Sequence, residues 1–417
     1  MKEDSAKVTS LPANNSDALI ELLKTGAQKM LAQAVEAEVA NYIEQFKDSR
    51  DSNGQRLVVR NGHHPERTIQ SGLGDIEIKQ PKVNDRRVDL DGVRQRFKSS
   101  ILPSYLRRTK SVEDLLPWLY LKGVSTGDFS EALSAILGKQ APGLSATTIT
   151  RLKSVWEEDY KKWSVSSLAA KKYVYIWADG VHFNVRLQED RMCILVIIGA
   201  TEDGTKELIA VTDGYRESSM SWKDILLKLN DRGLKSPPKL AIGDGALGFW
   251  KALEEVYPET KWQRCWVHKT ANILDKLPKS KQPEAKVDIH EIYNSETKAQ
   301  AQLAFDRFLE VYSDKYPKAA QCLKKDRDKL LNFYDFPGKH WSHIRTTNPI
   351  ESMFATVRLR TKRTKGCGSR IATLTMVHQL SLAAQKRWRK LNGSNLLADV
   401  INDRFIFVDG IKKERAA

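Results

Sequence analysis

Apolar and polar side chains alternate from residue 173 to residue 187, YVYIWADGVHFNVRL. Every second side chain is apolar, and a single carboxylate, Asp179, interrupts this apolar stripe. The period of two predicts a long strand with one buried face. An ionised carboxylate on that face is costly unless a cation or hydrogen bonds compensate it. The pattern therefore predicts a partner for Asp179, and a bound metal ion is the partner that we favour.

Asp179-Gly180 is also the composition of a two-residue hairpin turn, and a turn at this place is an alternative. The following segments favour the continuous strand. Residues 192–200 (MCILVIIGA) and 206–212 have the composition of two further strands, each preceded by polar turn residues. Three consecutive antiparallel strands are best accommodated if the first strand runs straight through Asp179.

The pattern after these three strands predicts a helix over 217–230, a short buried strand over 239–243, a helix over 246–257 and a strand over 261–267. In this order the fourth strand can lie parallel to the first and beside it. From residue 269 onward the periodicity is helical alone. The fold class that we expect is α/β, a ribonuclease-H-like mixed sheet with an all-helical insertion and a mostly helical N-terminal region.

The N-terminal half combines a long helical pattern over 16–46 with a small hairpin over 68–83. The helix must bury its apolar stripe in its own domain or against a second copy of the chain. Three short helical patterns follow, at 111–122, 126–137 and 145–156. They are compatible with a helix-turn-helix whose last helix offers Arg151 and Lys153 to the major groove, and equally with a plain helical bundle.

These patterns divide the chain into eight segments. They are a disordered leader (1–15), an N-terminal helix (16–47) that could serve dimerisation, a basic connector with a small hairpin (48–110), a helical domain that is helix-turn-helix-like (111–162), the first part of the sheet core (163–268), the helical insertion (269–345), the second part of the core (346–395) and a C-terminal tail (396–417).

The composition favours a polyanionic partner. The chain carries 68 Lys and Arg against 52 Asp and Glu, a formal charge of +16, which is typical of nucleic-acid-binding proteins. The four cysteines form no Cys-x-x-Cys pair, so a reducing cytoplasm is expected. The longest apolar run is too short to cross a bilayer, and the polar start is unlike a signal peptide. We expect no membrane partner and no small-molecule substrate.

Two further acids have both a structural and a chemical interpretation. Asp244, just past the fourth strand, could cap the following helix, and Glu351 could form a capping box with Asn348. In a ribonuclease-H-like sheet, however, both would meet Asp179, and three converging carboxylates need cations between them. Oxygen ligands suit Mg²⁺. We expect two Mg²⁺ ions about 4 Å apart, replaceable by Mn²⁺, which support in-line displacement at phosphorus.

The residues after Glu351 predict a track for a phosphodiester backbone. Arg358 and Lys362 share the helical stripe of Glu351, and no acid occurs from residue 352 to residue 370. Such unbalanced positive charge beside carboxylates indicates DNA contact. The predicted track consists of Arg358, Arg360, Lys362, Arg363, Lys365 and Arg370.

Five stretches resemble the Mutator-type family of bacterial insertion-sequence transposases, within the DDE group. They are RNGHHPERTIQSGLGDIEIKQPKV, IWADGVHFNVR, LAIGDGALGFWKAL, WQRCWVHKTANILDKLPK and IRTTNPIESMFATVRLRTKRTKG, spaced over most of the chain. The resemblance implies that Asp179, Asp244 and Glu351 are the catalytic and metal-binding triad, and that Cys265 and His268 are the family's Cys-x-x-His pair. Many relatives have Asp-x-Thr at the first acid, where this chain has Asp179-Gly180-Val181.

The same resemblance implies an activity and its partners. They are recognition of inverted-repeat ends, hydrolytic release of a 3′ hydroxyl, and attack of that hydroxyl on target DNA, in a protein that acts on the nucleoid in the bacterial cytoplasm. Because two DNA ends must be joined, a homodimer is expected.

Three rival interpretations remain. Gly243 to Gly248 form a formal GxGxxG motif, but Asp244 would face the pyrophosphate of a dinucleotide, and the acid expected for its ribose is missing after the next strand. A catalytically inactive DNA-binding regulator derived from a transposase is the second. The third is a zinc site, with Cys265, His268, His340 and His343 as ligands.

Overall fold

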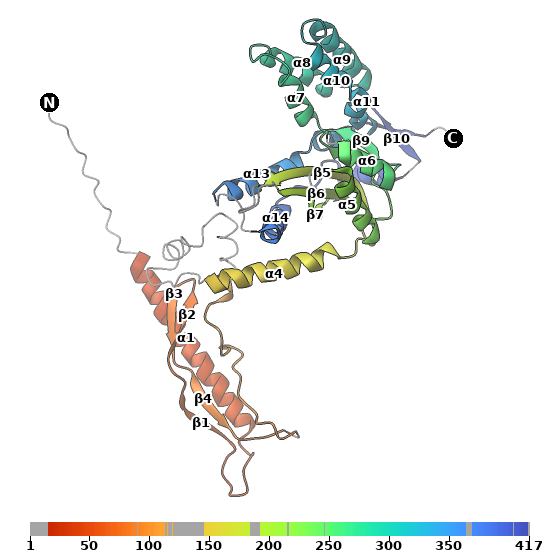
Figure 1. Ribbon diagram of the computed structural model, residues 1–417. Coiled ribbons are helices and arrows are strands. Elements are labelled where there is room, and N and C mark those ends of the chain that lie inside the picture. The colour runs from red at the N-terminus through yellow and green to blue at the C-terminus, as the bar shows by residue number, and fades with distance from the viewer. Residues whose placement is uncertain are drawn as a thin grey trace, which may run out of the picture. The chain divides into compact units, whose positions relative to one another are not determined.

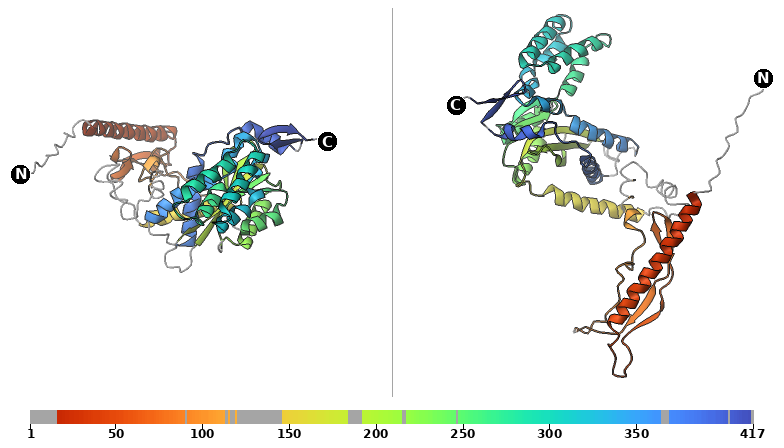
Figure 2. Two further views of the ribbon diagram at one scale, coloured as in Figure 1. Left: turned by 90° about the horizontal axis from the view of Figure 1, so that it is seen from above. Right: turned by 180° about the vertical axis from the view of Figure 1, so that it is seen from behind.

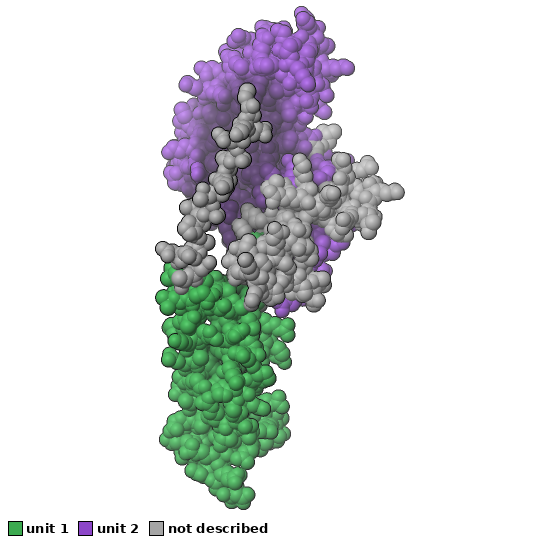
Figure 3. All heavy atoms as spheres, turned by 90° about the vertical axis from the view of Figure 1, so that its left-hand side faces the viewer, with its two compact units in different colours: residues 1–149 green, residues 150–417 purple. Residues whose placement is uncertain are grey.

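The computed structural model describes residues 16–89, 91–112, 115, 119, 146–183, 192–214, 217–245, 247–363, 369–402 and 404–415. The chain forms two compact units, residues 1–149 and residues 150–417 (Figure 3). Most of the predicted helical DNA-binding domain, 111–162, lies outside the described residues. This includes most of the first predicted helix and all of the second, so the choice between a helix-turn-helix and a plain bundle stays open. Its last predicted helix is present as α4 (Ala146–Ser164).

The first unit is built on a long helix, α1 (Ser16–Gln45), which packs against short antiparallel strands. Val35 on the helix meets Ile69, Ile78 and Leu102 in a small apolar core. Strand β1 pairs with β4, and β2 pairs with β3. The strands are β1 (Val58–His63), β2 (Arg67–Ser71), β3 (Gly74–Ile78) and β4 (Pro81–Asp85).

The predicted helix and hairpin of this unit are confirmed, since β2 and β3 pair tightly up to Ser71 and Gly74. The predicted connector, in contrast, contains the strand β1. Only its first residue, Val58, is fully buried, and the four residues from Arg60 onward are exposed. A strand with so little buried surface has no apolar period, and its backbone hydrogen bonds come from β4, which is far along the chain.

A five-stranded mixed sheet forms the centre of the second unit, in the order β7-β6-β5-β8-β9. β5 is antiparallel to β6, and β6 to β7, whereas β8 is parallel to both β5 and β9. This is the predicted strand arrangement. The strands are β5 (Tyr173–Phe183), β6 (Met192–Thr201), β7 (Lys206–Gly214), β8 (Leu240–Gly243) and β9 (Lys261–Arg264).

Asp179 and Gly180 lie in the interior of β5, where they pair with Val196 and Leu195 of β6. The hairpin-turn alternative for this dipeptide is therefore wrong. The pairing continues to both ends of β5, because the flanking apolar residues of the strand belong to the buried sheet.

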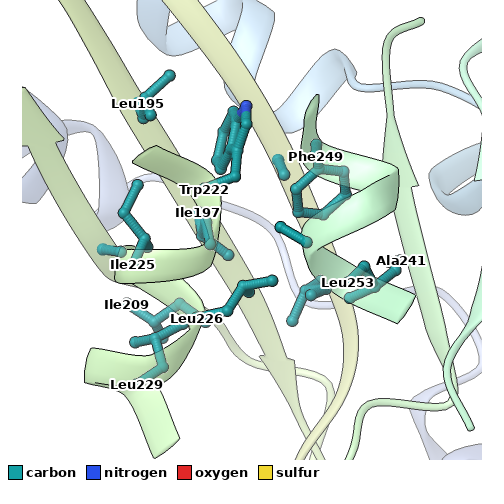
Figure 4. Close-up of a cluster of buried hydrophobic side chains, with 14 of the residues drawn as sticks. Leu195, Ile197, Ile209, Trp222, Ile225, Leu226, Leu229, Ala241, Phe249 and Leu253 are labelled. Atoms are coloured by element: carbon teal, nitrogen blue, oxygen red, sulfur yellow. The ribbon is translucent and has the colours of Figure 1, made fainter. Parts of the chain in front are cut away.

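Two helices, α5 (Ser219–Asp231) and α6 (Leu247–Val256), cover one face of the sheet. Figure 4 shows how Trp222 and Leu226 of α5 and Phe249 of α6 point toward the sheet residues Ile197 and Ala241. This cluster fixes where both helices begin, and the candidate site lies at those helix starts. The helices α13 (Asn348–Arg363) and α14 (Arg370–Gln385) contact β5 and β7 respectively.

The predicted insertion is a group of helices that leave and rejoin the sheet at one place. The backbone N–H of Trp266 donates to the carbonyl of Arg345 at 3.0 Å, so the two ends of the insertion meet. Figures 1 and 2 show α8, α9 and α10 together beyond α11 and β9. The elements are α7 (Trp266–Leu274), α8 (Gln282–Asn294), α9 (Lys298–Tyr312), α10 (Pro317–Lys324), α11 (Arg327–Leu330), η1 (Asn332–Asp335), η2 (Gly338–His340) and α12 (Trp341–Ile344).

The C-terminal segment, predicted as a plain tail, contains a turn η3 (Ser394–Leu396), a helix α15 (Leu397–Ile401) and a hairpin of β10 (Phe405–Val408) and β11 (Ile411–Glu414). Asp409 and Gly410 form its two-residue turn, with φ of 50° and 77°, as the type I′ geometry requires. Within the described part of the chain, no helix is long and apolar enough to cross a membrane.

Candidate active site

Asp179 lies on the central strand and is only 6% exposed. Its Oδ1 atom accepts a hydrogen bond of 2.8 Å from the backbone N–H of Gly180. Burial, followed by the negative charge of Asp244, raises the pKa of Asp179 to about 7, against the opposing effect of His268. The surroundings therefore disfavour the ionised form of Asp179, and a bound cation would remove that cost.

Asp244 follows β8, the parallel neighbour of β5. Ala178 of β5 pairs with Gly243 of β8, so the next residue on each strand, Asp179 within β5 and Asp244 just past β8, follows the last paired position. The indole Nε1 of Trp250 donates to the backbone carbonyl of Asp244 at 3.0 Å and holds this turn in place. Helix α6 is described from Leu247 onward, and residue 246 lies outside the described part, so the capping role of Asp244 stays a prediction.

Glu351 lies in the first turn of α13, and its Oε1 atom accepts a hydrogen bond of 3.1 Å from the hydroxyl of Thr347. The same hydroxyl and the backbone N–H of Thr347 each lie 3.3 Å from Sγ of Cys265. Helix α13 begins at Asn348, which makes Thr347 the preceding residue. The predicted capping box with Asn348 as its N-cap is therefore wrong, and the Glu351 carboxylate accepts from the Thr347 hydroxyl instead.

His268 lies next to Cys265 and Glu351 and interacts electrostatically with Asp179. Its Nδ1 atom lies 3.7 Å from Oε1 of Glu351. A hydrogen bond with Cys265, followed by the charges of Cys265, Asp179 and Glu351, raises the pKa of His268 to about 9. Although burial opposes ionisation of the Cys265 thiol, its hydrogen bonds with His268 and Thr347 lower its pKa. A protonated imidazole thus stands among the carboxylates that the sequence predicted to converge.

A fourth carboxylate, Glu217, belongs to the same cluster and was missed by the sequence analysis. A Cβ atom on Gly180 would lie 2.5 Å from Oε1 of Glu217, so the glycine lets this carboxylate rest against β5 next to Asp179. Burial and the negative charge of Asp244 raise the pKa of Glu217 to about 7. A glycine inside a strand often marks such a close approach, and Gly180 was the available signal.

The arrangement suits a divalent cation. Asp179 and Glu217 both have a raised pKa because they are buried beside the negative charge of Asp244. Ionised carboxylate oxygens are the ligands that Mg²⁺ binds, so a cation would stabilise their ionised forms. Cys265, His268 and Glu351 also offer ligand atoms within 4.8 Å of one another, and so do His182, Cys193 and Glu217. Burial raises the pKa of the Cys193 thiol to about 12, so this thiol is protonated in the metal-free protein.

Comparison with known proteins gives the family. The model of the family described as "Transposase, Mutator family" matches residues 2–390. The chain belongs to the Mutator family of transposases. It is 53% identical to the transposase for insertion sequence element IS6120 of Mycolicibacterium smegmatis, over 69% of this chain and 88% of the relative. It is 28% identical to the transposase for ISRM5 of Rhizobium meliloti strain 1021, over 94% of each chain.

Among solved structures, the Drosophila P element transposase strand transfer complex aligns with 73% of this chain and 84% of that chain, at 11% identity and a TM-score of 0.30.

The described basic residues that were predicted to contact DNA lie on the helices α4, α13 and α14 of this Mutator-family chain. Arg151 and Lys153 are exposed on α4. Arg358 lies on α13 with its guanidinium 5.9 Å from the ring centroid of Phe354, and Arg370 is paired with Asp213 at 3.0 Å. Arg360, Lys362 and Arg363 belong to α13, but their side chains, like the whole of Lys365, lie outside the described part.

The zinc interpretation does not fit this family member. Nδ1 and Nε2 of His340 are within hydrogen-bonding distance of the Tyr175 hydroxyl and the Gly393 carbonyl, at 2.8 and 2.9 Å. Nε2 of His343 accepts from the backbone N–H of Asn392. Both imidazoles are engaged away from Cys265 and His268, so the proposed four ligands do not form one site.

The GxGxxG interpretation also fails. A Cβ atom on Gly248 would lie 2.4 Å from the backbone oxygen of Glu217, and one on Gly245 would lie 2.3 Å from Nη2 of Arg264. These glycines allow close packing inside the protein, where a dinucleotide site would need them to admit a pyrophosphate.

Proposed function

We propose that this chain cuts the DNA ends of its own insertion sequence and joins the released 3′ hydroxyl to target DNA, with Asp179, Asp244 and Glu351 as the catalytic carboxylates. Two observations in this member of the Mutator family support the proposal. Asp179 is electrostatically coupled to Asp244 and His268, and His268 lies 3.7 Å from Glu351. Three acids on a strand, a neighbouring strand end and a later helix have no structural need to meet, whereas phosphoryl transfer requires such a cluster.

The catalytic core is ribonuclease-H-like in this proposal. Three antiparallel strands followed by two parallel strands, in the order β7-β6-β5-β8-β9, support it. The helical insertion between β9 and α13 accounts for the long interval between Asp244 and Glu351.

The carboxylates of Asp179, Asp244 and Glu351 would hold two Mg²⁺ ions, or Mn²⁺ in their place. When bound, such ions activate the attacking oxygen and stabilise the leaving one. Asp179 contributes a rigid position on the central strand, and Glu351 is oriented by Thr347 and His268. Without a divalent cation, the protonated His268 partly balances the negative charge and keeps the carboxylates together.

DNA is the partner in this proposal, with the inverted-repeat ends and the target bound along the basic residues of α4 and α13. The excess of 68 basic over 52 acidic residues supports a polyanionic ligand. A homodimer would bring two ends together, and the protein would act on the nucleoid in the bacterial cytoplasm.

A cleavage assay on DNA from the ends of this insertion sequence tests the proposal. The wild-type protein should nick the end only with Mg²⁺ or Mn²⁺. Asp244→Asn should abolish nicking and retain DNA binding, while Asp224→Asn, at an exposed acid of α5, should cut like the wild type. Binding without nicking by the wild type would instead identify a DNA-binding regulator.

A further inference from the structure

A cavity of about 260 Å³ lies beside the turn that carries Asp244. Gly245, the residue after this acid, is part of its wall, and Trp250, which holds the Asp244 carbonyl, is another part. The remaining wall comes from β9, α7 and the α10–α11 region of the insertion, including Arg264, Lys325 and Lys329. The cavity thus joins the insertion to the candidate active site.

Arg264 is the central group of this cavity. Its guanidinium packs against Gly245, where a Cβ atom would lie 2.3 Å from Nη2. The residue is 6% exposed, yet its Nε and Nη1 atoms have no hydrogen-bond partner among the described residues. Asp326 is the nearby counter-charge, with its Oδ2 atom 3.4 Å from Nε. A buried guanidinium with unused donors requires a further acceptor.

The cavity as a whole carries an excess of positive charge. Asp326 also forms a tighter ion pair with the buried Lys269, at 2.6 Å, so one carboxylate serves two cations. Lys325 and Lys329 add two exposed ammonium groups at the rim. Four cations against one anion, around unused N–H donors, form a site for an anion with several oxygens.

The aromatic rings that line the cavity already pack against other side chains of the protein. Trp250 and Trp262 stack on each other with ring centroids 5.0 Å apart and an interplanar angle of 21°. The ammonium of Lys329 lies 4.5 Å from the ring centroid of Trp262. A base therefore has no free indole face to stack on in this arrangement, whereas the guanidinium donors are available. The chemistry favours a phosphate group.

We propose that this cavity, which we call the Arg264 pocket (Gly245, Arg264, Lys269, Lys325, Asp326 and Lys329), binds a phosphate group of the DNA strand close to the bond that is cut. This assignment rests on the proposed function, since it places the phosphate next to Asp244. The pocket fixes the strand on the side of the insertion, so that the scissile phosphate lies at the carboxylates.

The test uses end DNA in which one phosphate at a time is a neutral methylphosphonate, and measures binding by the full chain in EDTA, where nothing is cut. One or two positions near the scissile bond should weaken binding of the wild type about 10-fold, the size of a lost charge-assisted contact. Methylphosphonates at the same positions should weaken DNA binding of Arg264→Gln by less than about 2-fold, because this variant already lacks the guanidinium that contacts the phosphate.

A second variant covers the chance that Arg264→Gln misfolds. Lys325→Gln combined with Lys329→Gln changes only exposed side chains and should lower the slope of binding against salt by about 0.7 to 0.9, the contribution of one phosphate. Lys324→Gln, at an exposed neighbour outside the pocket, is the matched control and should lower the slope by less than half of that. Failure of both the methylphosphonate coupling and the slope difference would overturn the proposal.

Inorganic phosphate supplies a second arm that distinguishes the source of the ligand. Thermal stabilisation of the wild type by phosphate, lost in Arg264→Gln, without any coupling to DNA phosphates would assign the pocket to a free phosphate compound and overturn the DNA assignment. Because binding is measured without metal, absence of cleavage in the separate Mg²⁺ assay would contradict the proposed function while leaving the outcome for the pocket intact.

Discussion

Nδ1 of His268 lies 3.7 Å from Oε1 of Glu351, although 82 residues separate them. The contact joins the start of the insertion to the helix that returns from it. His268→Gln removes the positive charge that faces the carboxylates. We expect a 10- to 100-fold lower cleavage rate, the usual order for a residue that orients a metal ligand, with higher Mg²⁺ required for half-maximal activity. His290→Gln, in α8, is the control and should leave both quantities unchanged.

Cys265 should act through hydrogen bonding and not through a zinc ion. Cys265→Ser keeps a group that can bond to Thr347 and His268, whereas Cys265→Val keeps only the volume. We expect Cys265→Ser to retain most of the cleavage rate and Cys265→Val to lose about 10-fold or more. Equal losses in both variants, together with zinc found in the wild type by elemental analysis, would contradict this role.

Glu217→Gln should have opposite effects on stability and on metal binding. In the metal-free protein it removes a negative charge beside Asp179 and Asp244, so the melting temperature at pH 8 should rise. The same change removes the negative charge of the Glu217 carboxylate beside Asp179 and Asp244. The affinity for Mg²⁺, measured by calorimetry, should therefore fall. Glu254→Gln, at an exposed position of α6, should change neither; a parallel loss of stability and affinity in Glu217→Gln would argue for a purely structural role.

The Asp179 carboxyl should make the metal-free protein progressively less stable than Asp179→Asn as the pH rises from about 4 to about 7. Burial holds the pKa of Asp179 at about 7 in the folded chain, against 3.8 in an unfolded one. The folded state therefore keeps a proton that the unfolded state has lost in this range, and stability falls with increasing pH. Melting temperatures in EDTA should show Asp179→Asn gaining over the wild type up to about pH 7, with no further gain above it. Saturating Mg²⁺ should reduce the difference in melting temperature between Asp179→Asn and the wild type.

Gly248 allows the starts of α5 and α6 to meet, and thereby places Glu217. Gly248→Ala puts a Cβ atom 2.4 Å from the Glu217 backbone oxygen, so the packing must shift, at a cost of about 1 to 3 kcal/mol in unfolding free energy. Gly26→Ala, where no atom lies within 4 Å of the added Cβ, should be neutral or slightly stabilising. Chemical denaturation of both variants checks the difference.

The central part of the fold could be predicted because its signals are local. The alternation through Asp179 and the short apolar strand before Asp244 define two parallel strands, and their register places the two acids directly after the pair Ala178–Gly243. The position of Glu217 could not be predicted, since it depends on the packing of α5 against Gly180 and Gly248. Strand β1 was missed for a related reason, because its partner lies far along the chain and it buries little surface.

Two identical dipeptides show the limit of a local signal. Asp179-Gly180 lies inside a strand, and Asp409-Gly410 makes a hairpin turn. The first is flanked by long apolar runs that belong to the buried sheet, so continuous pairing is favoured there. The second is flanked by two strands of four residues each that pair only with each other, and the turn conformation prevails.

The hydrogen bond between Trp266 and Arg345 closes the neck of the insertion. A segment whose two ends touch can change in length at its far side without separating the elements that flank it. Variation in the outer helices α8, α9 and α10 would therefore leave the neck residues, among them His268, where they are.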